Sequence, residues 1–201
     1  MSDIKQKENS LLVAYDRAAE ILRGAEPELV CRKTGATYED RTYGITFLDK
    51  VHEIRMPDVS FLGEGIPTIV EVLILHYLTS MEDKPVKGDF VSFSSIPDGM
   101  FYFKSFKQRA LDKLVSKFGK KPESLVAAAA ALGGTRWTAG KYSSIIPVLP
   151  KVDLVVQIYE ADDEFPAEAN ILFSDNVVNF LPVEDTAFLG GYLVGALVRA
   201  T

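Results

Sequence analysis

The sequence predicts an α+β fold, built as one compact domain over residues 1–201. Three observations lead to this prediction. Residues 149–181 alternate or run apolar in short segments that are typical of adjacent strands. Residues 67–80 leave almost no polar face, which is typical of a buried central helix. The order helix, three short strands, helix is predicted twice, in residues 10–80 and again in residues 123–199.

The first half begins with an amphipathic helix at residues 10–23, where apolar residues recur at helical spacing before Gly24. Strands are predicted at residues 29–33, 42–48 and 51–56, and the last two are joined by a tight turn. These segments are short and end at turn-forming residues, so we expect a small sheet.

The central helix, residues 67–80, carries two polar exceptions, Glu71 and His76. They are five positions apart, which places them about 140° apart around a helix, so they do not form a direct pair. A histidine in an apolar helix is usually a core residue bonded to a backbone carbonyl, and we expect this of His76. Both side chains are also candidates for lining a groove between the two halves.

The segment between the halves is predicted to form a hairpin, residues 89–94 and 100–103, whose turn at residues 96–99 contains proline, aspartate and glycine. An amphipathic helix is predicted at residues 105–118. Its basic residues form either a solvated face or a docking surface for an acidic partner or a phosphate-bearing ligand. They are Lys104, Lys107, Arg109, Lys113, Lys117, Lys120 and Lys121.

The second half is predicted to hold a helix at residues 123–132, a loop at 135–147, three strands within 149–181 and a last helix at 183–199. The small residues of this last helix recur at four-residue intervals and predict a close approach to another element: Ala187, Gly191 and Gly195.

The two halves share further features that indicate an internal duplication. Residues 47–51 and 173–177 are similar and each is predicted to be a hairpin turn. A proline, Pro57 or Pro182, ends each second strand before an apolar helix. A duplication predicts a pseudo-twofold arrangement, and such folds often place a ligand or partner groove between their halves.

An acidic loop interrupts the predicted strands of the second half. Several carboxylates converging from a flexible loop could hold a hard cation, but the spacing does not match a calcium-binding loop and no glycine makes its sharp turn. A solvated turn or a partner-contacting loop fits better. Its aromatic residue either packs into the core, which we expect, or is offered to a partner. The candidate partner or ligand contacts are Asp162, Asp163, Glu164, Phe165 and Glu168.

Composition excludes several classes of protein. The formal net charge is −6, which disfavours broad binding to nucleic acid. The single cysteine, Cys31, cannot form an internal disulfide or a thiolate metal site. The first ten residues are too polar for a signal peptide, and the longest apolar runs fall short of the about 20 residues that span a bilayer. We therefore expect a soluble cytoplasmic protein, and we assign no catalytic residue, cofactor or metal.

Several short stretches together resemble a prokaryotic family of unknown function that is common in anaerobes. The stretches are LHYL at 75–78, FKSF at 103–106, LGG at 132–134, LPK at 149–151 and DEFP at 163–166. Some members of that family are fused to a small four-cysteine iron–sulfur domain, from which this chain departs because it has Cys31 alone. The resemblance implies at most an accessory role near iron–sulfur or corrinoid metabolism, with such a protein as partner, and it transfers no catalytic residue.

These observations favour a non-catalytic binding or accessory module of unknown function. The alternative is an enzyme whose active site lies in the groove between the halves. A deep pocket that exposes Glu71 or His76 would favour the enzyme, whereas a shallow groove rimmed by loops would favour the binding module.

Overall fold

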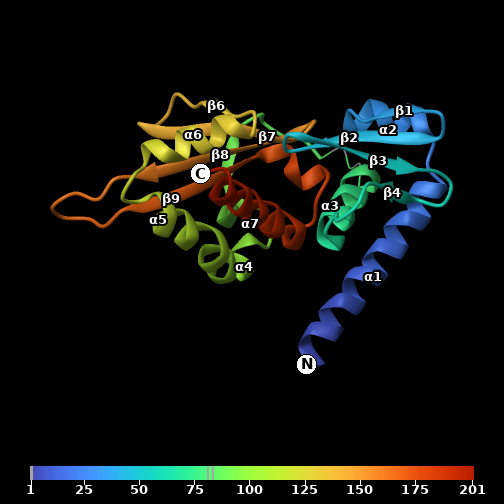
Figure 1. Cartoon of the computed structure of the whole chain (residues 1–201), viewed down its shortest axis with the longest axis horizontal. Coiled ribbons are helices and arrows are strands. Elements are labelled where there is room, and N and C mark those ends of the chain that lie inside the picture. The colour runs from blue at the N-terminus through green and yellow to red at the C-terminus, as the bar shows by residue number, and fades with distance from the viewer. Residues whose placement is uncertain (1, 81, 83) are drawn as a thin grey trace.

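The computed structural model describes residues 2–80, 82 and 84–201, and its helices and antiparallel sheets confirm the α+β fold class (Figure 1). The first sheet within this part of the chain is formed, in order, by β1 (Thr37–Glu39), β2 (Thr42–Phe47), β3 (Lys50–Arg55) and β4 (Ser60–Leu62). The second sheet is formed, in order, by β5 (Phe90–Ser92), β9 (Glu168–Ser174), β8 (Val152–Tyr159), β7 (Tyr142–Leu149) and β6 (Thr135–Arg136).

The helices surround these two sheets, which lie side by side along the long axis of the molecule (Figure 1). The α-helices are α1 (Ser2–Arg23), α2 (Pro27–Thr34), α3 (Thr68–Thr79), α4 (Gly99–Phe106), α5 (Asp112–Phe118), α6 (Glu123–Ala131) and α7 (Val183–Arg199). Short helical turns are η1 (Phe93–Ser95), η2 (Lys107–Leu111) and η3 (Asp175–Asn179). None of the helices in the described part of the chain combines the length and the hydropathy that crossing a bilayer requires.

The helix predicted to be central is indeed buried. α3 packs against α1, and its Leu73, Leu75 and Tyr77 are fully buried. One continuous cluster of buried side chains spans both sheets and includes Leu75 from α3 and Leu154 from β8. The apolar pattern of residues 67–80 therefore predicted both the helix and its position in the core.

Two hydrogen-bonded junctions join the first half of the chain to the second. At the tip of the β2–β3 hairpin, the Leu48 amide donates to the Val148 carbonyl at the end of β7 (2.9 Å). The hydroxyl of Tyr77 donates to the Thr34 carbonyl (2.7 Å) and accepts a hydrogen bond from the Lys151 amide (3.1 Å). Burial raises the pKa of Tyr77, so this hydroxyl keeps its proton and can serve both partners.

Residues 29–33 are helical, so the strand predicted there is wrong. Pro27 occupies the first turn of α2, where its missing amide costs nothing. Gly35 ends the helix in the left-handed region (φ 76°) and donates its amide to the Cys31 carbonyl (2.8 Å). Pro27 and Gly35, which flank the predicted strand, thus mark the start and the end of a short helix.

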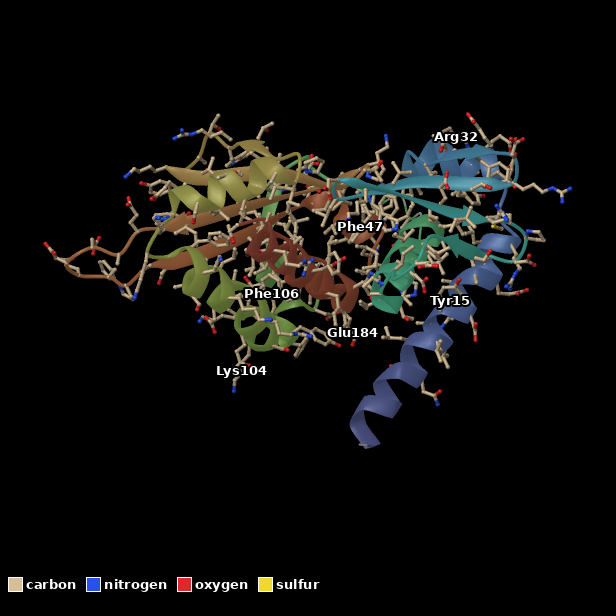
Figure 2. The ribbon with its side chains drawn as sticks, viewed as in Figure 1. Tyr15, Arg32, Phe47, Lys104, Phe106 and Glu184 are labelled. Carbon is tan, nitrogen blue, oxygen red and sulfur yellow. The ribbon has the colours of Figure 1, made fainter. Side chains whose placement is uncertain are left out.

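The hairpin predicted at residues 89–94 and 100–103 is also wrong. β5 pairs with β9 instead, and the second predicted strand lies in α4. Gly99 is the first residue of that helix. A side chain is excluded at this position because a Cβ atom there would lie 2.0 Å from the carbonyl oxygen of Phe93. The predicted amphipathic helix continues from α4 through η2, a π-helical turn, into α5. Lys104 points away from the body of the molecule, and Phe106 is buried (Figure 2).

The second sheet differs from its prediction at both ends. Residues 135–147, predicted to be a loop, contain β6 and most of β7, and the register of β7 shifts between Pro147 and Leu149. The third predicted strand is the helical turn η3, so residues 173–177 are not a hairpin turn. In each half a helix is still followed by four antiparallel strands and another helix, and the internal duplication remains a prediction.

The close approach predicted for α7 occurs at a different glycine. A Cβ atom on Gly190 would lie 2.8 Å from the Phe106 ring and 3.1 Å from the Phe173 ring. A Cβ atom on Gly191 would meet nothing within 4 Å, and one on Gly195 would approach only the Arg199 guanidinium. The helix is therefore rotated so that Gly190 faces the aromatic core and the stripe of Gly191 and Gly195 does not.

Candidate functional site

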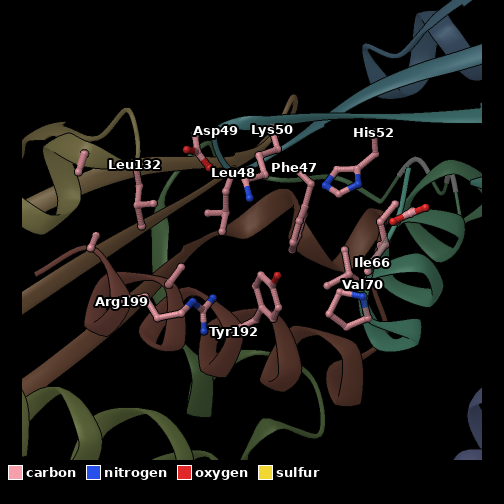
Figure 3. Close-up of a pocket in the computed structure, with 16 residues that line it drawn as sticks. Phe47, Leu48, Asp49, Lys50, His52, Ile66, Val70, Leu132, Tyr192 and Arg199 are labelled. Atoms are coloured by element: carbon pink, nitrogen blue, oxygen red, sulfur yellow. The ribbon is translucent and has the colours of Figure 1, made fainter. Parts of the chain in front are cut away.

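A cavity of about 670 Å³ lies between the two halves of the chain (Figure 3). Its walls come from the β2–β3 hairpin, from the loop before α3 and from the C-terminal ends of α6 and α7. We call it the inter-sheet cavity. Its volume falls in the range of small-molecule sites. Its lining includes Phe47, Asp49, Lys50, His52, Glu64, Ala131, Tyr192 and Arg199.

Aromatic side chains from both halves meet in the inter-sheet cavity. The ring of Phe47 on β2 lies 5.4 Å from that of Tyr192 on α7, and 6.2 Å from the His52 imidazole, which it meets edge-on. The Arg199 guanidinium lies 5.8 Å from the centre of the Tyr192 ring. This cation–π contact holds a positive group beside an aromatic wall, an arrangement that can hold both an apolar and a charged part of a ligand.

The charged side chains of the inter-sheet cavity have no ion-pair partner within the described residues. Lys50 and Arg199 are directed into the space between the hairpin and α7 (Figure 3). Asp49 and Glu64 also line the cavity, and neither is within salt-bridge distance of a basic group in the part of the chain that the structure describes. All four are therefore free to pair with a ligand.

The pKa of the His52 imidazole is shifted by its surroundings in the inter-sheet cavity. Burial lowers the pKa of its imidazole, and the positive charge of Lys50 lowers it further. The ring is therefore mostly neutral at pH 7, when one nitrogen donates a hydrogen bond and the other accepts one.

The two predicted groove residues, Glu71 and His76, do not line this cavity. The His76 imidazole hydrogen-bonds the carboxylate of Asp185 on α7, rather than the backbone carbonyl that we expected. Glu71 is half-buried, which raises the pKa of its carboxyl, and its charge helps to raise the pKa of Tyr15 after the larger effect of burial. His76 thus joins α3 to α7, and Glu71 on α3 lies near Tyr15 on α1.

The acidic loop between β8 and β9 projects from the end of the second sheet (Figure 1). Phe165 is 64% exposed, so the expectation that it packs into the core is wrong. Asp162 accepts hydrogen bonds from the amides of Glu164 (2.9 Å) and Phe165 (2.7 Å), which lower the pKa of its carboxyl. This turn presents Phe165 to solvent directly after Asp163 and Glu164.

The structure does not bring the acidic loop and the inter-sheet cavity together. Glu160 at the start of the loop pairs with Lys141 (2.9 Å), and Glu168 begins β9. Among the described residues, no three histidine, cysteine, aspartate or glutamate side chains form a group that could hold a metal ion.

The residues that line the inter-sheet cavity were not singled out by the sequence. Lys50 lies in the turn predicted between residues 42–48 and 51–56, and Arg199 is the last residue of the helix predicted at 183–199, where a basic side chain complements the helix dipole. The sequence predicted a groove between the two halves and named Glu71 and His76 as its residues, neither of which lines the inter-sheet cavity.

No curated protein and no solved structure is significantly similar to this chain. A family model does match, and it covers residues 26–196, which include both sheets, the inter-sheet cavity except its last few residues, and the acidic loop. The chain therefore belongs to the family described as "Domain of unknown function (DUF3786)".

Proposed function

We propose that this protein is a cytoplasmic, non-catalytic binding module that holds a small molecule in the inter-sheet cavity. The observation that carries the proposal is the pair of cations, Lys50 and Arg199, which face a cavity of about 670 Å³ without an ion-pair partner among the described residues. Charged groups without partners beside an aromatic wall are a frequent feature of ligand sites.

The lining of the inter-sheet cavity supports binding over catalysis by a serine, threonine or cysteine nucleophile. It contains none of these three residue types among the described residues, and its hydroxyl is the phenol of Tyr192. The His52 imidazole makes no hydrogen bond to another side chain or to the backbone of the described chain, so no neighbouring group orients it as a general base. The alternative, an enzyme in this groove, would need His52 to act without such a group.

Native mass spectrometry of the protein purified from the organism that encodes it tests the proposal. Ala131 lines the inter-sheet cavity at the end of α6, whereas its neighbour Ala130 is equally exposed and does not. We expect wild type and Ala130→Trp to retain a bound small molecule, and Ala131→Trp to lose it. A wild-type protein without any adduct, or an adduct that persists in Ala131→Trp, would refute the proposal. A retained molecule that changes mass on incubation would favour the enzyme.

A second candidate function, capture of a partner protein, is supported by the exposed Phe165. An exposed aromatic between carboxylates is suited to a partner with an apolar pocket and a basic rim. From the family resemblance, we propose an iron–sulfur or corrinoid protein as that partner. Phe165→Ala, and separately Asp163→Asn with Glu164→Gln, should leave folding nearly intact and lower the iron or cobalt recovered in pull-downs from host lysate.

Phe101→Ala is the matched control for this experiment, because Phe101 is 85% exposed and lies outside the acidic loop. It should leave recovery unchanged. If the loop variants recover the same partners at the same yield, the loop is a structural connector.

A further inference from the structure

The outer edge of β9 is only partly covered by its neighbour β5. The two strands pair at Phe90 with Ser174, at Val91 with Phe173 and at Ser92 with Leu172. After Ser92 the chain turns into the helical turn η1 and leaves the sheet. Residues 168–171 of β9 therefore pair with β8 on one side and, within the described chain, with no strand on the other.

A second cavity, of about 610 Å³, lies along this uncovered edge. Its lining includes four consecutive residues of β9: Glu168, Ala169, Asn170 and Ile171. Successive residues of a strand point to opposite faces of its sheet, so a cavity that touches all four lies along the edge and not over one face. We call it the edge cavity. It gives access to backbone amide and carbonyl groups that no strand within the described chain pairs with.

The wall opposite the strand belongs to the long helix. It combines apolar side chains, Phe103 of α4, Leu111 of the π-helical turn η2 and Val115 of α5, with the polar Lys107, Asp112 and Ser116. A π-helical turn inside an α-helix is rare and is often found at functional sites. The edge cavity thus combines an open strand edge on one side with apolar side chains on the other.

The helix that forms this wall is strongly basic, although the whole chain carries a net charge of −6. Residues 99–121 hold seven basic side chains, all of them exposed, and a single acidic one, Asp112, which pairs with Lys107 (2.5 Å). The six other basic side chains have no ion-pair partner within the described chain, which suits an acidic molecule that approaches this helix.

We propose that the edge cavity binds an extended acidic peptide segment of a partner protein, which adds to β9 as a further strand where β5 leaves the sheet. The open backbone groups of residues 168–171 bond the main chain of the peptide, because a strand edge is complementary to another strand. Alternate side chains of the peptide pack on the apolar wall, and its carboxylates face the lysines. Four paired residues span about 13 Å of peptide. This site is separate from the inter-sheet cavity and does not depend on the function proposed for it.

The probe for the test is a fluorescein-labelled octapeptide of alternating glutamate and valine, measured by fluorescence anisotropy. A lysine–valine peptide tests the charge requirement. A glutamate–valine peptide with every main-chain amide N-methylated tests the strand pairing, because it lacks main-chain donors. Two protein variants form a matched pair, since both serines are exposed on the same run of helix but only Ser116 lines the edge cavity: Ser116→Trp and Ser105→Trp.

We expect the glutamate–valine probe to bind wild type and Ser105→Trp alike, and to bind Ser116→Trp at least about tenfold more weakly. N-methylation should weaken binding by about tenfold or more, because several main-chain hydrogen bonds are lost. Bound probe should also slow amide hydrogen exchange within residues 168–171 of the wild type.

Three results would overturn the proposal. The first is no binding of the glutamate–valine probe at millimolar concentration. The second is equal binding of the N-methylated or the lysine–valine peptide. The third is binding that leaves amide exchange at residues 168–171 unchanged, a readout that does not depend on how well Ser116→Trp folds.

Discussion

Nδ1 of His76, on α3, donates a hydrogen bond to Oδ2 of Asp185, in the first turn of α7. The two residues are 109 positions apart, and their pair joins a helix of the first half to a helix of the second. Asp185 is 8% exposed, and His76 supplies its partner in this largely buried position. A buried carboxylate that loses its partner keeps the cost of its lost hydration.

We predict that His76→Ala and Asp185→Ala each destabilise the protein by about 1–3 kcal/mol. The double variant should lose less than the two single losses together, with a coupling energy of about 0.5–3 kcal/mol. Urea unfolding of all four proteins measures this cycle. Additive losses would mean that the two side chains act independently.

We predict that Leu73→Ala and Leu75→Ala each cost about 2–5 kcal/mol, because both side chains are fully buried in α3. Leu12→Ala on α1 is the matched control, since Leu12 is 54% exposed and should cost less than about 0.5 kcal/mol. Losses from Leu73→Ala and Leu75→Ala as small as the control would remove α3 from the core.

Gly190 and Gly191 are neighbours on α7 with opposite surroundings, so Gly→Ala should change stability in opposite directions. Gly190→Ala places a methyl group 2.8 Å from the Phe106 ring, which is buried and stacked on Phe93, and should cost about 1–3 kcal/mol. Gly191→Ala meets nothing within 4 Å and should gain about 0.5–1 kcal/mol from helix propensity. Thermal melts of both variants decide, and a stabilising Gly190→Ala would place that face of α7 away from the aromatic core.

We predict that His52 titrates below its ordinary pKa and that Lys50→Gln raises this pKa only part of the way back, because burial is the larger cause. NMR of the imidazole C–H protons measures both values, and His76 is the only other histidine. An unchanged His52 pKa in Lys50→Gln would mean that the ammonium lies away from the inter-sheet cavity.

The same shift affects stability with a definite sign. The unfolded chain takes up the His52 proton at a higher pH than the folded protein does, so the folded state loses stability as pH falls from the ordinary histidine pKa to the lowered one. His52→Gln should remove this part of the pH dependence. Urea unfolding at several pH values between these limits, with wild type and His52→Gln side by side, checks the direction.

The sequence by itself determined the elements whose pattern is local and long. α3 was predicted to within one residue at each end, and α7 to the residue, because each is a run of apolar positions bounded by proline and by a change of composition. The β2–β3 hairpin was also predicted, since strand alternation and turn residues are properties of adjacent positions, although its turn lies at residues 48–49 and not at the predicted 49–50.

Tertiary structure decided whatever depends on contacts between distant residues. Residues 29–33 and 175–179 are short and rich in β-branched or apolar residues, so their local preference was weak and packing selected helical turns. The rotation of α7 against the sheet decides which of its glycines faces Phe106. The spacing of apolar residues does not fix this rotation to within one residue. The partner of His76, the walls of the inter-sheet cavity and the open edge of β9 each bring together residues tens of positions apart. No local sequence pattern encodes these contacts, because they form only when both halves are packed on one core.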